Sequence, residues 1–157
     1  MTPLWIGCTV TAGLGMVAGA VWGWRRLVST LRETSVKQAR EMFQLRREWL
    51  EAEFVKLASQ SGKPRGLIWA DCDFDDEVRF ARDRATGALR ALVAVTISFE
   101  ARPGGGMEHV EAVGNLRAAT AVFAYERNAW RTDGRAVFNL SPLQTIKHFE
   151  GELELVE

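Results

Sequence analysis

An uncharged run of 22 residues near the amino end, from Pro3 to Trp24, constrains this chain more than any other feature. A helix rises about 1.5 Å per residue, so the run would span roughly 33 Å and cover the ~30 Å hydrocarbon core of a bilayer. Trp5 lies near one end of the run and Trp22 near the other, where indole rings favour the headgroup boundary. The run therefore predicts a transmembrane helix.

A buried core helix and a cleaved signal peptide are the alternative interpretations of this run. A soluble chain of 157 residues rarely contains so long a helix that is apolar on every side. A signal peptide has basic residues before its apolar stretch, whereas here no Lys or Arg precedes the run, which continues directly into Arg25 and Arg26. We therefore expect residues 1–24 to be a transmembrane anchor in a lipid bilayer.

Basic residues flank only the carboxyl side of the run. They are Arg25, Arg26, Arg32, Lys37 and Arg40. The positive-inside rule then predicts a single-pass protein of the cell's inner membrane, with its N-terminus outside and its C-terminal domain in the cytoplasm. Arg outnumbers Lys by 16 to 4, which favours a GC-rich, bacterial source. The 20 basic and 20 acidic residues balance, so we expect no nucleic-acid partner.

Small residues recur at every fourth position within the uncharged run. They are Gly7, Thr11, Gly15, Gly19 and Gly23. This spacing puts them along one stripe of a helix, where small side chains let two helices approach closely in lipid. Glycine is also frequent in membrane helices in general, which is the alternative explanation. The stripe predicts packing against a second copy of the chain or against a partner's membrane helix, and the sequence does not separate the two.

Residues 25–60 contain neither Pro nor Gly and are rich in strong helix formers, so we expect a juxtamembrane helix there. Its apolar stripe at helical spacing consists of Ala39, Phe43, Leu50, Phe54 and Leu57, widened by Met42, Leu45 and Trp49. Ser35 and Gln38 interrupt a coiled-coil seam. We therefore expect residues 39–58 to lie across a sheet and residues 25–38 to form a stalk.

In residues 61–157, the third expected domain, the apolar period changes from about 3.6 residues to about 2, which predicts strands. The expected strands are 67–70, 78–83, 88–100, 109–126 with a bend at Gly114, and 130–140 with a turn at Asp133-Gly134. Residues 88–100 are apolar on both faces, so this strand should be central. The tail 152–156 alternates in the way of a last edge strand.

A short final helix is expected after Ser141, because serine followed by proline is typical of a helix N-terminus. Leu143, Ile146 and Phe149 would face inward. One long helix, four or five antiparallel strands and a short helix make an α+β fold, most simply a curled sheet wrapped around the long helix. This layout resembles the cystatin or NTF2 style of roll, and an analogy at the level of the fold carries no function.

The densest group of carboxylates lies between Asp71 and Glu77. Hard cations need several oxygen ligands, so Asp71, Asp73 and Asp75 are candidate ion ligands. The segment does not fit an EF-hand, because Asp76 stands where that loop requires glycine. The alternative, which we favour, is an acidic turn that leads into an edge strand and whose charges block edge pairing.

His109 and Trp130 complete the candidate ligand-binding residues. The second histidine, His148, is far from His109 in sequence and no H-x-x-x-H motif is present, so the sequence does not support a metal site. Trp130 lies in a tight aromatic and charged turn, where it is either a binding platform or a core residue. No G-x-S-x-G motif is present, and the glycine-rich 102–107 segment lacks the Lys and Ser or Thr of a P-loop. We expect no catalytic residue and no cofactor.

These features favour a single-pass membrane-anchored protein whose small cytoplasmic α+β domain works by binding or assembly rather than by catalysis. Two alternatives place a pocket between the sheet and residues 39–58. In the first, the pocket binds a small ligand. In the second, an Asp or Glu together with His109 makes the domain a hydrolase or isomerase.

Overall fold

The computed structural model describes residues 35–60 and 66–156. Residues 35–60 are helical, and the compact unit that carries the sheet, Met42–Glu157, includes residues 42–60 of this helix. Within the described ranges, no helix is both long enough and apolar enough to cross a bilayer. The 3–24 run and its stripe of small residues lie outside the described residues.

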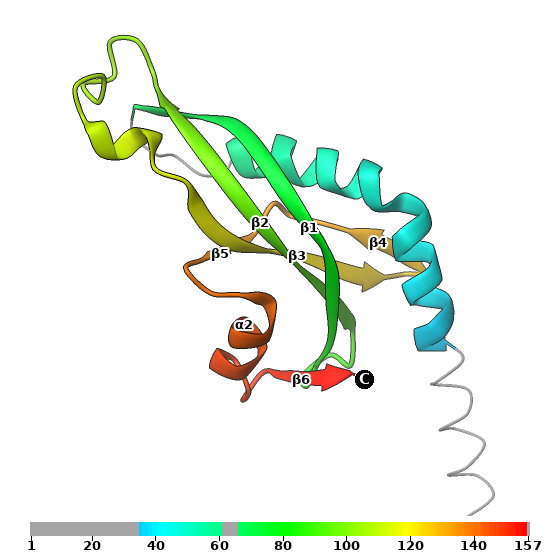
Figure 1. Cartoon of the computed structure of the whole chain (residues 1–157). Helices are drawn as coiled ribbons and strands as arrows, with labels where there is room; N and C mark the ends of the chain where they lie inside the picture. Colours follow the sequence, from blue (N-terminus) through cyan, green and yellow to red (C-terminus); the bar gives the residue numbers. More distant parts are fainter. Residues whose placement is uncertain (1–34, 61–65, 157) are drawn as a thin grey trace, which may run out of the picture. The chain divides into compact units, whose positions relative to one another are not determined.

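The unit is α+β, as predicted: a helix is followed by an antiparallel sheet and a short second helix (Figure 1). The elements after the first helix are β1 (Leu67–Asp83), β2 (Leu89–Ala101), the 3-10 helix η1 (Glu111–Gly114), β3 (Arg117–Glu126), β4 (Ala129–Arg131), β5 (Ala136–Phe138), α2 (Pro142–His148) and β6 (Leu153–Val156). The strand order is β4-β3-β2-β1-β6, and β5 also pairs with β3. The described sheet therefore has six strands rather than four or five, because β4 and β5 pair separately with β3 and the tail adds β6.

β2 is the middle strand of the order, which confirms the prediction from its two apolar faces. On one face its alternate residues Leu89, Ala91, Val93, Val95 and Ile97 are buried. On the other face Leu92 is buried against Ala81 and Ile146. A strand with apolar residues on both faces lowers its free energy most where it is covered on both sides.

The acidic segment is not a turn, and this corrects the expectation from its composition. Residues 71–77 continue β1, and the ladder to β2 runs on through Cys72↔Ile97 and Phe74↔Val95. Register shifts fall between Trp69 and Asp71 and between Phe74 and Val78. Such bulges let a strand take in extra residues without leaving the sheet, so charged residues are accommodated inside it.

The expectation of a strand at 109–113 is also wrong. Residues 111–114 form η1. Two backbone hydrogen bonds close tight turns here. Val110 N–H donates to the Met107 carbonyl at 3.1 Å, and Val113 N–H donates to the Val110 carbonyl at 3.0 Å. The physical reason is the length of the β2–β3 ladder, which ends at the pair Ile97↔Arg117. Residues before Arg117 have no strand opposite them in this ladder, so their backbone groups bond locally.

The main core lies between the sheet and residues 42–60 of the helix, where aromatic side chains pack edge to face. Phe43 is fully buried, with its ring centroid 5.4 Å from that of Phe123 and 5.0 Å from that of Trp130. Phe54 is also fully buried, 5.8 Å from Phe74. Leu50 and Ala58 complete the buried stripe of the helix.

Leu45 and Trp49 do not widen this stripe. Leu45 is 86% exposed and Trp49 is 57% exposed. Successive helical residues are rotated by about 100°, so these two side chains point away from the face that carries Phe43 and Leu50. The sheet covers only the opposite side of the helix.

Helix α2 begins as predicted, at Ser141 and Pro142. The Ser141 hydroxyl accepts a hydrogen bond from Gln144 N–H, and the Gln144 side chain accepts one from Ser141 N–H, which is a complete capping box. Ile146 is buried as expected, but Leu143 is 52% exposed. Thr145 is buried in its place, because Pro142, Thr145 and Ile146 form the row of α2 that faces the sheet.

Candidate functional site

Helix α2 and residues 42–60 of the long helix lie on opposite faces of the sheet (Figure 1). A pocket of about 370 Å³ lies on the face that carries α2. We call it the α2 pocket. Its floor is formed by Arg90 and Leu92 of β2 and Val122 and Ala124 of β3. Its walls are formed by Thr145, Phe149, Glu152 and Leu153 on one side, and by Arg131, Thr132, Asp133, Arg135 and Val137 on the other. Asp83 and Glu126 complete the lining.

The two walls come from different parts of the chain. α2 packs on the sheet through Ile146, which contacts Ala81, Leu92 and Leu153. The other wall is the 131–137 arm, which joins β4 to β5 and runs along the edge of β3. This arrangement leaves the floor residues of β2 and β3 open between α2 and the arm, so the pocket is a product of tertiary structure.

Thr145 is the most unusual residue of the α2 pocket. Its side chain is 1% exposed, and its Oγ1 has no hydrogen-bond partner among the described residues. A buried hydroxyl without a partner costs about 1–3 kcal/mol of folding free energy. Thr145 is also one of the residues that line the α2 pocket.

Asp83 and Arg90 form an ion pair at the end of the pocket where β1 turns into β2. Arg90 Nη2 donates to Asp83 Oδ2 at 3.0 Å, and the backbone N–H groups of Ala85 and Thr86 donate to Asp83 Oδ1 at 3.1 and 3.0 Å. The hydrogen bond from the Thr86 backbone, followed by that from Arg90, lowers the pKa of Asp83 to about 2. Asp83 is therefore ionised at neutral pH and holds the Arg90 guanidinium against the floor.

The 131–137 arm is fixed by hydrogen bonds to its own side chains and to β3. Thr132 Oγ1 donates to the Val122 carbonyl at 3.2 Å and accepts from Gly134 N–H at 3.0 Å. Arg135 N–H donates to Asp133 Oδ1 at 3.0 Å. The Arg135 guanidinium lies 5.8 Å from the centre of the Phe149 ring, so a cation–π contact joins the two walls of the pocket.

The rim of the α2 pocket carries both signs of charge. Arg131 and Arg135 are exposed, as are Glu126, Asp133 and Glu152. The pocket therefore combines a floor of three apolar residues and Arg90, one buried hydroxyl and a rim with charges of both signs. This combination is typical of a site that selects a polar group by hydrogen bonding and by charge complementarity.

The candidate residues from the sequence do not meet at one place in the structure. Asp71, Asp73 and Asp75 lie on β1, His109 is exposed in the segment before η1, and Trp130 is 2% exposed in the aromatic core. Among the described residues, no group of three or more His, Cys, Asp or Glu side chains is placed to hold a metal ion. The small-residue stripe at Gly7, Thr11, Gly15, Gly19 and Gly23 lies outside the described ranges.

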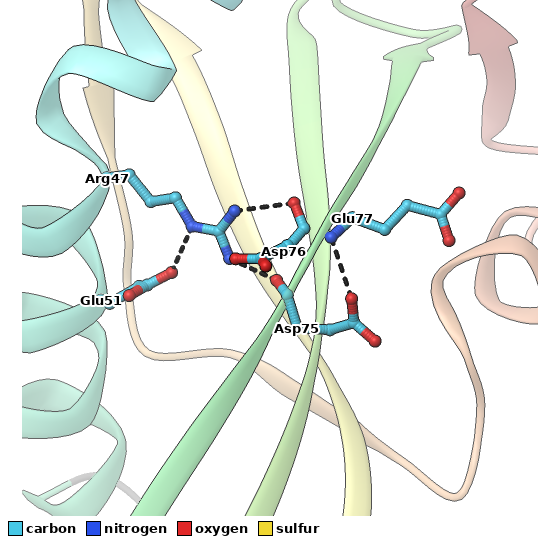
Figure 2. Close-up of polar contacts among 5 residues, drawn as sticks. All are labelled: Arg47, Glu51, Asp75, Asp76 and Glu77. Carbon is cyan, nitrogen blue, oxygen red and sulfur yellow. Dashed lines mark hydrogen bonds and ion pairs between the residues drawn. The ribbon is translucent and has the colours of Figure 1, made fainter.

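The acidic segment of β1 is held to the helix by main-chain groups. Arg47 donates to the carbonyl oxygens of Asp75 and Asp76, the latter at 2.8 Å, and its Nε donates to Glu51 Oε1 at 2.6 Å (Figure 2). The Asp75 carboxylate instead accepts from Glu77 N–H at 2.9 Å (Figure 2). Cys72 lies in the same acidic segment of β1. Its burial, and to a smaller extent the charge of Asp71, raise the pKa of its thiol to about 11. This thiol stays protonated at neutral pH.

The residues of the α2 pocket were not candidates from the sequence alone. Thr145 lies three residues after Pro142 and four before Phe149, so helical spacing puts it in their row, but its polarity favours an exposed position. Asp83, Arg90 and Arg135 come from three separate segments. No family model, curated protein or solved structure that was compared with this chain matches it.

Replacement of Asp83 by Asn tests the ion pair. The pKa of Asp83 is lower in the folded protein than in the unfolded chain, where it is about 4. The ion pair therefore stabilises the fold above about pH 4, and this stabilisation is lost as the pH falls towards about 2. Because both side chains are partly exposed to water, we expect a loss of the order of 1 kcal/mol at pH 7. Urea unfolding at pH 7 and at pH 2.5 measures it.

The matched control for this prediction is Asp73→Asn, at an exposed carboxylate of the same strand. We expect this change to leave the free energy of unfolding within about 0.5 kcal/mol of wild type. The difference in the free energy of unfolding between Asp83→Asn and wild type should be smaller at pH 2.5 than at pH 7. A difference that stays constant between the two pH values would contradict the assigned pKa.

Proposed function

We propose that this chain is a single-pass membrane-anchored assembly protein, whose α+β domain binds a partner protein through the α2 pocket. The observation that carries the proposal is the buried, unpartnered hydroxyl of Thr145 at the edge of that pocket. In this proposal a polar side chain of the partner enters the pocket and exchanges a hydrogen bond with Thr145 Oγ1. The charged residues on the rim of the pocket then favour a partner whose residues around that side chain carry the opposite charges.

Two observations support binding at the α2 pocket rather than between the sheet and the long helix. The space between the sheet and residues 42–60 is occupied by the rings of Phe43, Phe54, Phe123 and Trp130. The space beside α2 is open and has a polar lining. A curled roll of the cystatin or NTF2 style, attached by residues 1–24 to the inner membrane, remains part of this proposal.

Thr145→Val separates stability from binding, because valine has nearly the same shape and no hydroxyl. We expect the free energy of unfolding to rise by about 1 kcal/mol, since the variant no longer buries an unpartnered polar group. Urea unfolding of the full chain in mild detergent measures this, with Thr145→Ser as the variant that keeps a hydroxyl. A stability loss of similar size in Thr145→Val would show that the hydroxyl is satisfied in the folded protein.

Site-specific photocrosslinking in native membranes tests the proposed binding. A photoreactive residue at Asp133, on the rim of the pocket, should give a discrete protein adduct that Thr145→Val weakens and Thr145→Ser retains. The control position is Lys147, which is exposed on α2 and does not line the pocket. Equal adducts from both positions would contradict the proposal. A small-molecule adduct in place of a protein adduct would instead show that the α2 pocket binds a small ligand.

A further inference from the structure

The solvent side of the long helix carries two large apolar side chains one turn apart. Leu45 is 86% exposed and Trp49 is 57% exposed. Both border a surface hollow that is also lined by Gln44, Arg46 and Glu48. The sheet already occupies the opposite side of this helix through Phe43, Leu50 and Phe54. A helix with an apolar surface on both sides is typical of one that packs against two neighbours.

The spacing of this outer surface is that of a short coiled-coil seam, which begins after the polar residues Ser35 and Gln38 at the preceding a and d positions. Its members are Met42, Leu45, Trp49 and Ala52, at intervals of three, four and three residues. In a coiled coil a side chain from one helix fills a hole between residues i, i+3, i+4 and i+7 of the other. Leu45, Glu48 and Trp49 supply three members of such a hole, and they border the hollow. The surface therefore fits another helix with the same spacing.

Of the two charge pairs beside the seam, one favours a second copy in parallel orientation and the other opposes it. With Leu45 at position d, Glu41 takes a g position and Arg46 the following e position. In a parallel pair, g of one helix faces the next e of the other, so Glu41 of one copy meets Arg46 of its partner. The next such pair joins Glu48 to Glu53, and Lys56 Nζ lies 3.6 Å from Glu53 Oε2, which reduces that repulsion.

We propose that two copies of this chain pair in parallel through the Leu45–Trp49 surface of the helix. The parallel orientation rests on the proposed membrane anchor, because both copies then leave the bilayer on the same side. The surface itself is independent of the α2 pocket, which lies on the other face of the sheet. Pairing would thus present two α2 pockets, each facing away from the helix pair.

Disulfide crosslinking of the full chain in membranes tests this pairing. Cys8→Ser and Cys72→Ser remove the native thiols, and Leu45→Cys then places one cysteine at a d position. Two d positions face each other in a parallel pair, so we expect at least about tenfold more disulfide-linked dimer from Leu45→Cys than from Gln44→Cys. Gln44 is an exposed neighbour at a c position, which is not one of the a and d positions of the seam. Unchanged thermal unfolding of both variants confirms that they fold.

Each other result identifies a different occupant of the surface and overturns the proposal. Equal dimer yields at 44 and 45 would show pairing by the membrane segment without this surface. A disulfide adduct of another mass would identify a different protein. Absence of a dimer, with lipid vesicles protecting Leu45→Cys from a water-soluble maleimide, would identify the bilayer. Thr145→Val should leave the crosslink unchanged, so failure of the pocket proposal and failure of the pairing proposal remain distinguishable.

Discussion

Phe54→Ala is expected to lower the free energy of unfolding by about 3–5 kcal/mol, one of the two largest effects of a single substitution in this domain. Phe54 is fully buried, and its ring lies 5.8 Å from Phe74 and 5.9 Å from Phe123. Removal of the ring loses its transfer free energy and leaves a cavity that rigid aromatic neighbours fill poorly. Urea unfolding of the full chain in mild detergent, followed by near-ultraviolet circular dichroism, measures the loss.

Two further variants make this prediction specific to the aromatic core. Phe54→Leu keeps most of the apolar volume and should cost about 1–2 kcal/mol, so it remains measurable if Phe54→Ala does not fold. Leu143→Ala removes a side chain that is 52% exposed and should cost less than about 0.5 kcal/mol. Equal losses from Leu143→Ala and Phe54→Leu would contradict the assignment of the core.

The contrast between Leu143 and Phe54 shows what periodicity predicts and what it does not. A helical period places Phe43, Leu50 and Phe54 on one face, and the structure buries them. The helical period does not predict how much of the helix surface the sheet covers, because that depends on the shape of the sheet. Leu45 and Trp49 extend the apolar stripe in the sequence but lie beyond the contact with the sheet.

Local signals of strand and helix ends predict the fold well where no distant contact competes with them. The two apolar faces of residues 88–100 predict the central strand, and the Ser141-Pro142 pair predicts the start of α2. The acidic segment is different, because ladder pairing with β2 and the bonds from Arg47 to two backbone carbonyls keep it in β1. Those partners lie more than 20 residues away in sequence, so local composition favours a turn.

The α2 pocket is the least predictable feature, because no single segment contains it. Its lining joins β1, β2, β3, the 131–137 arm and α2, and one of its wall residues is a buried threonine. Polar residues are predicted as exposed unless a partner is known. Thr145 is buried beside Ile146, which packs on Ala81 and Leu92, so its burial follows from the way α2 packs on the sheet.

Gly134→Ala is expected to lower the free energy of unfolding by about 2–4 kcal/mol, because a side chain there meets two obstacles. Gly134 has a φ of +77°, a left-handed conformation that favours glycine. A Cβ at this position would also lie 2.5 Å from Ala58 N and 2.8 Å from the Leu57 carbonyl carbon, both backbone atoms of the long helix. Thermal and urea unfolding of the full chain measure the combined effect.

Gly106→Ala separates these two causes. Gly106 has a nearly identical φ of +76°, but a Cβ there meets no atom within 4 Å. It should cost only about 1 kcal/mol, the conformational part of the effect. Losses of equal size at the two positions would show that the arm does not press on the helix.

The close approach of Gly134 to Ala58 also connects the helix to the α2 pocket. Arg135, the next residue, lines the pocket and faces the Phe149 ring. In Gly134→Ala the arm must move away from the helix, and Arg135 must move with it. We therefore expect this variant to reduce the Asp133 photocrosslink at temperatures where the domain is still folded, whereas Gly106→Ala leaves it unchanged. An undiminished crosslink in folded Gly134→Ala would show that the position of the arm does not control the pocket.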